Sequence, residues 1–304
     1  MNWSECSFQF KCQYNFKKMK RNVLITGTST GVGYQSALLF GENGFKVYAT
    51  MRNLKKADAL KEQITQNNLD IEILELDVTK TASIKSAVET IIDKDGRIDV
   101  LVNNAGAGFA KTTEQSSEDE IRWVTEVNYL GTVFCTQAVL PYMRKQRAGQ
   151  IINITSVGGL VGQPFNELYC GAKFAIEGFA EGLASYVTDA FNINISNVEP
   201  GGISTEFMNS AVDKTKTNGQ LASGEYLPIF QAYLEGNQKR AEESEVQVYQ
   251  TGREVAEVVL KVAQNDNPPM RIRTSQWAEE LCELKTSADP DGTKLVAQVK
   301  SSFL

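Results

Sequence analysis

The sequence contains no histidine in 304 residues. Histidine is the side chain whose ordinary pKa lies closest to neutrality, so proton transfer by this chain must use other groups. Imidazole-based metal sites are excluded, and the carboxylates and cysteines show no metal-ligand spacing, so we expect no bound metal. The five cysteines are scattered without a Cys-x-x-Cys motif. This pattern predicts reduced thiols and a cytoplasmic protein.

Long apolar runs are also absent from the sequence. No segment has the pattern of a signal peptide or of a membrane span. The net charge of −6 and the pI near 5.1 argue against nucleic acid or an anionic membrane as the main partner. An apolar fraction of 42% and a charged fraction of 22% are ordinary for a globular protein, whose length suits one large α/β domain or two small ones.

The first segment, residues 1–20, mixes aromatic and polar side chains and ends in the basic run Lys17-Lys18-Met19-Lys20-Arg21. We expect a disordered extension here, with Met19 as a candidate natural start, and a folded domain over residues 21–304. No internal repeat or low-complexity tract indicates a second domain.

From Asn22 onward, short apolar runs alternate with helical stretches. Such alternation predicts a parallel sheet with helices on both faces and ligands at the carboxyl ends of the strands, where the strand order reverses. The predicted strands are 22–26, 45–50, 71–76, 98–102, 150–154 and 193–198. The predicted helices include 118–147, 166–190 and 254–263.

The turn after the first predicted strand reads Thr26-Gly27-Thr28-Ser29-Thr30-Gly31-Val32-Gly33. Its three glycines allow a sharp turn and let a pyrophosphate approach the N-terminus of the next helix. The spacing is Gly-x-x-x-Gly-x-Gly rather than Gly-x-Gly-x-x-Gly, and alone it fits a plain tight turn too. Its place between a strand and a helix favours phosphate binding.

The end of the second predicted strand indicates which nucleotide is bound. Enzymes that use NAD place an acid on the ribose hydroxyl about 20 residues after the glycines. Here the chain reads Thr50-Met51-Arg52-Asn53, with no acid. Arg52 can hold a 2′-phosphate through two hydrogen bonds, and Thr30 can add a hydroxyl contact, so we expect NADP rather than NAD. The alternative is a solvated surface arginine.

Tyr169 and Lys173 are spaced by one helical turn, and Ser156 lies upstream after a predicted strand. Residues at i and i+4 share a helix face, so the Lys173 ammonium can lie near the Tyr169 hydroxyl. A positive charge about 5 Å away, at an effective dielectric near 20, favours the phenolate by roughly 3 kcal/mol. We therefore expect a lowered Tyr169 pKa and an acid–base role, although this spacing alone is also common in surface packing.

Together these motifs resemble the short-chain dehydrogenase/reductase family over about residues 21–202. Residues Ser156–Leu160, Tyr169–Ala175 and Tyr48–Arg52 resemble the branch of 17β-hydroxysteroid dehydrogenase type 1 and photoreceptor retinol dehydrogenase. The matches across the family are the Thr26–Gly33 turn, Asp77, Asn103-Asn104-Ala105-Gly106, Asn128, Ser156, Tyr169 with Lys173, and Pro200-Gly201.

The resemblance implies a doubly wound Rossmann fold in a single domain, and it implies roles for individual residues. Tyr169 would exchange a proton with the substrate oxygen, which Ser156 would hydrogen-bond. Lys173 would hold the nicotinamide ribose, and Asn128 would support a water that links Lys173 to solvent. Asp77 would meet the adenine. The residues expected around NADP are Gly27, Ser29, Thr30, Gly31, Val32, Gly33, Arg52, Asp77, Val78, Asn104, Ala105, Gly106, Tyr169, Lys173, Pro200 and Gly201.

The segment after Gly201 is expected to form a substrate lid over about residues 203–250. An apolar pocket lined by Ser156, Leu160, Phe165, Tyr169 and Phe207 would suit a bulky steroid-, retinoid- or lipid-like alcohol or carbonyl. The alternative is that these apolar side chains pack on one another or on a second subunit. The steroid enzyme carries a histidine at its substrate end, whereas this chain has none, which argues against estrogen-like specificity.

The leading interpretation is an NADP-dependent oxidoreductase. A lyase or epimerase on the same fold and a redox-sensing NADP-binding protein remain alternatives, although sensors commonly lose the tyrosine or lysine that this chain keeps. The predicted helices 118–147 and 166–190 are expected to pair subunits in a homodimer or homotetramer.

Overall fold

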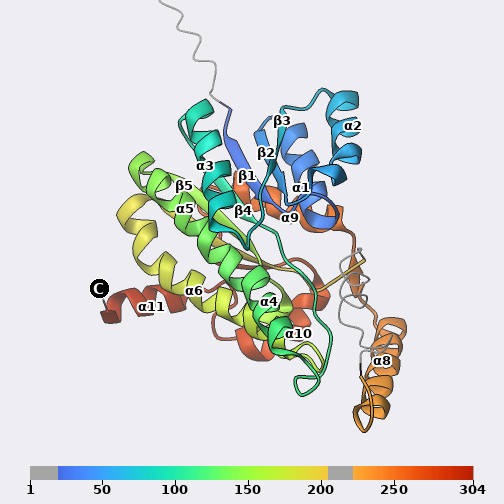
Figure 1. The fold of residues 1–304 in the computed structure, drawn as a ribbon. Coiled ribbons are helices and arrows are strands. Elements are labelled where there is room, and N and C mark those ends of the chain that lie inside the picture. Colours follow the sequence, from blue (N-terminus) through green and yellow to red (C-terminus); the bar gives the residue numbers. More distant parts are fainter. Residues whose placement is uncertain (1–19, 205–221, 304) are drawn as a thin grey trace, which may run out of the picture.

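The main sheet runs through the middle of the molecule, and its strands are parallel to one another (Figure 1). The computed structural model describes residues 20–204 and 222–303. Within these residues the sheet has seven strands in the order β3-β2-β1-β4-β5-β6-β9. The strands are β1 Asn22–Thr26, β2 Lys46–Met51, β3 Ile71–Glu75, β4 Val100–Asn103, β5 Gly149–Ile154, β6 Ile193–Glu199 and β9 Arg271–Arg273.

Helices cover both faces of this sheet (Figure 1). One apolar cluster joins the sheet to α1, α2 and α9, and a second joins it to α3, α5 and α6. Every residue of β1 is buried, which explains its uninterrupted apolar run. The helices are α1 Gly31–Glu42, α2 Asp58–Asn67, α3 Thr81–Asp95, α4 Glu118–Thr125, α5 Gly131–Gln146, α6 Glu167–Phe191, α8 Tyr226–Glu243, α9 Gly252–Gln264, α10 Gln276–Thr286 and α11 Thr293–Phe303.

The chain reverses its direction of winding between β1 and β4, which pair in the centre of the sheet. Beyond β1 the chain builds β2 and β3 to one side, and after β4 it builds β5, β6 and β9 to the other. Loops that leave the carboxyl ends of β1 and β4 therefore diverge, and a ligand can lie between them.

The doubly wound parallel sheet is confirmed, and the six predicted strands lie within two residues of the observed ones. Predicted helix 118–147 is α4 and α5 joined by a π-helical turn, η2 Glu126–Leu130. Strand β9 was not predicted as a strand, because Arg271-Ile272-Arg273 is too short and too charged to show a periodic pattern. Residues 1–19 of the expected extension lie outside the described part of the chain.

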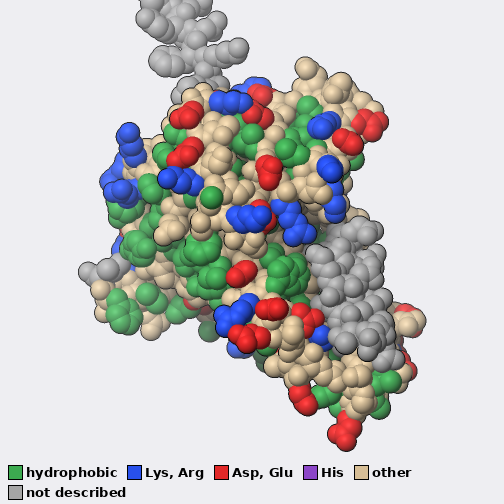
Figure 2. All heavy atoms as spheres, in the orientation of Figure 1, with side chains coloured by type: hydrophobic (Ala, Val, Ile, Leu, Met, Phe, Trp, Pro, Cys, Tyr) green, Lys and Arg blue, Asp and Glu red, His purple; other side chains and the backbone are tan. Residues whose placement is uncertain are grey.

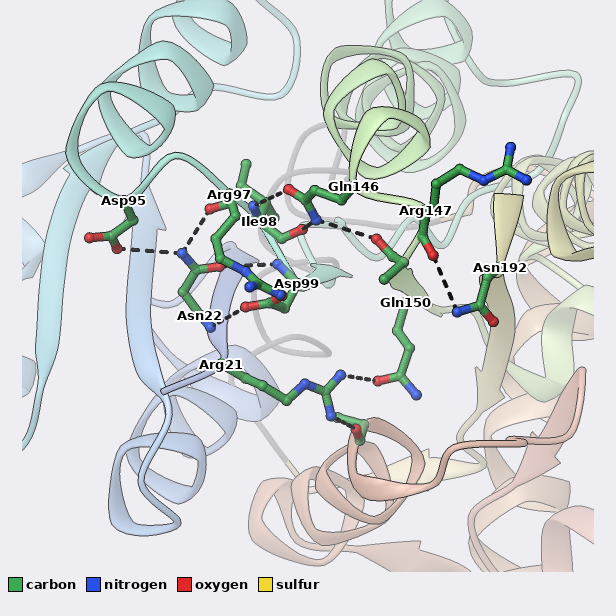
Figure 3. A network of polar contacts seen from close by, with 12 residues as sticks. Arg21, Asn22, Asp95, Arg97, Ile98, Asp99, Gln146, Arg147, Gln150 and Asn192 are labelled. Atoms are coloured by element: carbon green, nitrogen blue, oxygen red, sulfur yellow. Dashed lines mark hydrogen bonds and ion pairs between the residues drawn. The ribbon is translucent and has the colours of Figure 1, made fainter. Parts of the chain in front are cut away.

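A polar network joins the amino ends of the strands, at the edge of the sheet away from the glycine-rich turn (Figure 3). The backbone N–H of Asn22 donates to Asp99 Oδ2 at 2.8 Å, and the backbone N–H of Asp99 donates to Asn22 Oδ1 at 3.0 Å. Arg97 Nε also donates to Asp99, at 2.8 Å, and Arg21 donates to Gln150 at 2.7 Å. The network fixes β1 beside β4 and β5 before the chain reaches the site at the other edge.

We predict that Asp99→Ala lowers the free energy of unfolding by about 1–3 kcal/mol, because it leaves a buried N–H and a charged guanidinium without their acceptor. Urea denaturation measures the change. The control Glu243→Ala removes an exposed carboxylate that lies 3.7 Å from Lys239, and it should change stability by less than about 0.5 kcal/mol. Equal effects of the two substitutions would contradict this account.

Candidate active site

The turn from β1 to α1 has a backbone that only glycine adopts without strain. Gly27 and Gly31 lie in the left-handed region, with φ of 73° and 62°. Gly33 is required for a different reason, because a Cβ there would lie 2.3 Å from both the Gly27 carbonyl oxygen and the Asn104 side-chain nitrogen. The turn is therefore pressed against the loop that follows β4.

Hydrogen bonds hold this turn from two sides. The backbone N–H and the hydroxyl of Thr28 donate to the Thr50 carbonyl at the end of β2, at 2.9 and 3.1 Å. Asn104 Nδ2 donates to the carbonyls of Thr26 and Gly27 at 2.8 and 3.0 Å. The backbone N–H groups of Asn104 and Ala105 both donate to Thr26 Oγ1 at 3.0 Å. Asn104 and Ala105 thus support the turn, and their expected contact with NADP stays a prediction.

The N-terminus of α1 suits a phosphate. Thr30 occupies the N-cap without a side-chain cap bond, and the first turn carries no acidic residue. Ser29 and Gly31 are half-buried and Thr30 is exposed, whereas Val32 and Gly33, which also carry N–H groups of the first turn, are buried. Unsatisfied N–H groups and the helix dipole favour an anion at such a position.

Residues after β2 and β3 lie next along the same edge of the sheet. Arg52 follows β2 directly and its side chain is exposed, without a hydrogen bond or ion pair to the residues that the structure describes. Asp77 Oδ1 accepts from the backbone N–H and the hydroxyl of Thr79 at 3.1 and 2.8 Å. Val78 is buried against Gly131, where a Cβ would lie 2.8 Å from the Val78 Cβ. Val78 therefore packs the start of α5 and presents little surface to a ligand.

Tyr169 and Lys173 lie one turn apart on α6, as the spacing predicted. Lys173 Nζ is 5.6 Å from the centre of the Tyr169 ring. The lysine is only 4% exposed and donates to the Ile154 carbonyl, the last of β5, at 2.9 Å. Its ammonium is thereby fixed at the carboxyl edge of the sheet.

Ser156 begins the short 3-10 turn η3 Val157–Gly159, and its hydroxyl accepts from the Gly158 N–H at 3.0 Å. A hydrogen bond also joins Ser156 to the Tyr169 hydroxyl. The N–H of Val157 donates to the Pro200 carbonyl at 2.9 Å. This bond ties the serine turn, which contacts Tyr169, to the Pro200-Gly201 segment after β6.

Asn128 supports the loop after β4, which lies between Lys173 and the glycine turn. Asn128 lies on the π-helical turn η2, and such turns are frequent at functional sites. Its side chain accepts from the Ala107 N–H at 3.0 Å and donates to the Ala107 carbonyl at 2.9 Å. A Cβ on Gly106 would lie 3.0 Å from Asn128 Oδ1 and 3.7 Å from Lys173 Nζ. The loop after β4 therefore touches Lys173 on one side, and through Ala105 it contacts Gly27 on the other, where a Gly27 Cβ would lie 2.8 Å from the Ala105 Cα.

The lowered Tyr169 pKa that the sequence suggested is wrong for this structure. Burial raises the pKa of Tyr169, and the hydrogen bond from Ser156 offsets only part of this effect. Burial also lowers the pKa of Lys173 to about 8. Desolvation disfavours both charged forms, and the interpretation from the i, i+4 spacing counted the attraction of the ammonium without this cost.

The expected substrate residues pack against other side chains. Leu160 belongs to a cluster with Val157 and with Ala278 and Cys282 of α10. The Phe165 ring lies 4.9 Å from that of Phe230 on α8, centre to centre. Phe207 lies outside the described residues. The alternative in which these apolar side chains pack on one another is therefore realised for Leu160 and Phe165.

Two contacts at this end of the molecule had no signal in the sequence. The amide of Gln115 donates to the backbone carbonyl and the hydroxyl of Ser223, each at 3.0 Å, and the Tyr226 hydroxyl donates to Glu114 at 2.6 Å. They join the loop after β4 to the start of α8 across more than 100 residues, so no local pattern could reveal them. The Trp277 ring covers Gly201, where a Cβ would lie 2.8 Å from it.

Within residues 20–204 and 222–303, no group of three or more acidic or cysteine side chains could hold a metal ion. In the same ranges no helix has the length and apolarity to cross a bilayer. Cys135, Cys170 and Cys282 are buried free thiols.

Comparison with known proteins finds relatives that match most of this chain. The chain is 35% identical to a 3-ketodihydrosphingosine reductase of Bacteroides thetaiotaomicron over 88% of its own length and 93% of the relative's. It is 35% identical to mouse 17-beta-hydroxysteroid dehydrogenase type 1, covering 90% and 79% of the two chains. It is 36% identical to bovine retinol dehydrogenase 8, covering 91% and 88%.

Solved structures show the same fold. The structure of ElxO with NADP bound superimposes with a TM-score of 0.70 at 30% identity, covering 84% of this chain and 97% of the other. A family model described as short chain dehydrogenase matches residues 21–216. Fold, motif order and relatives agree, and the chain belongs to the short-chain dehydrogenase family, near the 17-beta-hydroxysteroid and retinol dehydrogenases.

Proposed function

We propose that this oxidoreductase interconverts an alcohol and a carbonyl on a bulky apolar substrate, with NADP as its cofactor. The observation that carries the proposal is the junction at Gly106. There the loop after β4 touches the glycine turn through Ala105 and lies beside Asn128 and Lys173. A phosphate-binding helix end and a buried acid–base pair thus lie at one edge of one sheet.

The residues present fit a dinucleotide. The N–H groups after Thr30 would hold the pyrophosphate, and Arg52 would hold a 2′-phosphate beside the end of β2. Asp77 would meet the adenine; Thr79 uses its Oδ1, and its Oδ2 lies 4.0 Å from Lys80 Nζ. Lys173 would hold the ribose hydroxyls near Tyr169. The nicotinamide, when bound, supplies or accepts the hydride, and orientation is the main contribution of the protein.

Proton transfer to the substrate is assigned to Tyr169, with Ser156 and Lys173 in support. A raised pKa keeps the Tyr169 hydroxyl protonated at neutral pH, so it can donate its proton to a carbonyl oxygen that gains negative charge. Ser156, already hydrogen-bonded to Tyr169, would orient the same oxygen. The Lys173 ammonium would stabilise the tyrosinate left behind. These groups suit the direction of carbonyl reduction near neutral pH.

The relatives and the apolar surroundings of the site support the proposed substrate class. Their names specify a ketosphinganine-type lipid, a steroid and a retinoid, which are all large apolar alcohols or carbonyls. Phe165, Phe230 and Tyr233 form an aromatic cluster that joins α8 to the segment just before α6. Apolar side chains near the start of α6 favour an apolar substrate with a single reacting oxygen.

The assembly we propose is a homodimer or homotetramer through α5 and α6, in the cytoplasm. Hydrophobic side chains gather on the face that these helices form (Figure 2). Phe174 and Tyr186 of α6 are 38% and 49% exposed. At Gly178 and Gly182 an added Cβ would meet no atom within 4 Å, so another helix could approach closely there. The buried free thiols suit a reducing compartment.

We predict that Tyr169→Phe lowers carbonyl reduction by about 100-fold or more while NADPH affinity stays nearly unchanged, because the ring remains and only the donor is lost. Reduction of 3-ketodihydrosphingosine, a 17-keto steroid and retinal would be followed by NADPH absorbance, and binding by NADPH fluorescence. Retained turnover would remove Tyr169 from its role. Tight NADPH binding by the wild type with no turnover of any carbonyl would favour a redox sensor.

We predict that Arg52→Asp shifts the ratio of kcat/KM for NADPH over NADH by about 100-fold toward NADH. The substitution removes a partner for the 2′-phosphate and supplies an acceptor for a ribose hydroxyl. Lys55→Asp, on the exposed 3-10 turn just beyond, is the control with the same change of charge. An unchanged ratio for Arg52→Asp, or an equal shift for the control, would contradict the assignment.

The pH profile should follow Lys173. Because its pKa is lowered to about 8, the ammonium is present below this pH and lost above it. We predict that kcat/KM for carbonyl reduction is level near pH 7 and falls about tenfold per pH unit above the midpoint. A profile that stays level to pH 10 would show that the charge on Lys173 does not support the reaction.

A further inference from the structure

Glu177 continues the helix face that carries Tyr169 and Lys173. The three residues are spaced by one turn each along α6, so their side chains lie on one stripe of the helix. Glu177 is only 5% exposed. A carboxyl group is rarely buried without a charged partner or a set of donors, so its position needs an explanation.

A chain of amide side chains ends on the Glu177 carboxyl group. Asn103, Asn153 and Asn197 are register partners on β4, β5 and β6. Asn103 Nδ2 donates to Asn153 Oδ1 at 2.9 Å, and Asn153 Nδ2 donates to Asn197 Oδ1 at 2.9 Å. Asn197 Nδ2 then donates to Glu177 Oε2 at 2.6 Å. Each amide donates toward Glu177, so the ladder points its dipoles at an acceptor that carries negative charge.

The other carboxyl oxygen lies under the turn that carries Ser156. Glu177 Oε1 is buried and has no hydrogen-bond partner among the described residues. A Cβ on Gly159 would lie 3.3 Å from Oε1 and 3.1 Å from the Glu177 Cγ. The side chain therefore fills the space beneath Gly159, three residues from Ser156. Glu177 supports the serine turn from below and lies next to Lys173 along the helix.

Other charged and titratable groups face Glu177 from each neighbouring element. They are Lys173 and Glu181 on α6, Glu199 on β6, Arg271 on β9 and Cys282 on α10, together with the hydroxyl of Thr155.

The two arginines of β9 already have acidic partners. Arg273 donates to Glu199 at 3.1 Å, and Arg271 lies 3.9 Å from Glu181 and 3.7 Å from Asp289. Lys173 is different, because among the described residues it makes no ion pair and its ammonium donates to a backbone carbonyl. Glu177 is the acid whose charge acts on that lysine.

The charge on Lys173 depends on the charge on Glu177. Burial raises the pKa of Glu177 to about 7 and lowers that of Lys173 to about 8, and the charge of Glu177 opposes the second shift. Without the carboxylate, desolvation would act on the ammonium with less compensation, and Lys173 would lose its proton at a lower pH.

We propose that Glu177 is a positioning residue that keeps the Lys173 ammonium charged, while its carboxyl group, oriented by the asparagine ladder, supports the serine turn. Glu177 does not touch the substrate or the cofactor. Its consequence for turnover rests on the proposed function, because it acts through Lys173. Its effect on the charge of Lys173 is a property of the protein alone and can be measured without a ligand.

The test compares the titration of Lys173 in the wild type and in Glu177→Gln, which keeps the shape and an acceptor for Asn197. Protein with isotope-labelled lysine side chains is followed by NMR from pH 6 to 11, and Lys173→Arg identifies the Lys173 signal. We expect the Lys173 midpoint to fall by about one pH unit in Glu177→Gln. An unchanged midpoint in a folded variant overturns the proposal.

Glu181→Gln is the matched control, because Glu181 lies one turn further along α6 and faces Arg271 rather than Lys173. It should leave the Lys173 midpoint unchanged or slightly higher. A fall equal to that in Glu177→Gln would overturn a specific role for Glu177.

Should Glu177→Gln fail to fold, Asn197→Ala removes the donor that favours the charged carboxyl, and it should lower the Lys173 midpoint by a smaller amount. No fall in that variant contradicts the proposal.

NADPH binding separates this inference from the proposed function. If the lysine holds the ribose, the affinity of the wild type falls as pH rises through the Lys173 midpoint, and Glu177→Gln moves that fall to lower pH. A purely structural role would weaken binding equally at every pH. Absence of NADPH and NADH binding by the wild type would contradict the proposed function alone, whereas binding with the same pH midpoint in both proteins would contradict the role of Glu177.

Discussion

The burial of the Lys173 ammonium is the constraint on which the site depends. An ammonium out of water must find fixed acceptors or lose its proton. Here the last carbonyl of β5 accepts from it at 2.9 Å, and the loop at Gly106 closes over it. The lysine can occupy this place only because α6 packs along β5 and β6 and the loop after β4 carries no side chain at Gly106. The same packing places Tyr169 and Ser156 together.

Close backbone contacts connect the lysine site to the glycine-rich turn, where we expect the phosphate to bind. Gly27 and Gly33 leave room for Ala105 and Asn104, and Asn104 returns two hydrogen bonds to the turn. The loop after β4 is thus a common wall, which touches the glycine turn on one side and Lys173 on the other. Its position is fixed by Asn128, whose amide binds the backbone of Ala107 in both directions. The loop after β4 therefore contributes both to the expected phosphate site and to the surroundings of Lys173.

Local sequence patterns predicted the helices and strands well, but they predicted the direction of the Tyr169 pKa shift wrongly. The sequence predicted the buried strands, the glycine turn and the Tyr169–Lys173 stripe, because each depends on residue type at a short, fixed spacing. Strand β9 and the Gln115–Ser223 contact were not, since they exist only once distant segments pack. The sign of the Tyr169 pKa shift was also missed. Spacing reveals a neighbouring cation, whereas desolvation depends on everything packed around the pair. The role of Glu177 could not be predicted for the same reason, because a single glutamate in a helix has no distinctive sequence pattern and its burial depends on tertiary packing.

The most direct test of the account is a crystal structure of the protein with NADPH bound. The account predicts the pyrophosphate against the N-terminus of α1, the 2′-phosphate beside Arg52, and the Tyr169 hydroxyl close to the reactive carbon of the nicotinamide, with Lys173 on the ribose. A nucleotide bound elsewhere, or a Tyr169 hydroxyl that faces away from the nicotinamide ring, would contradict it.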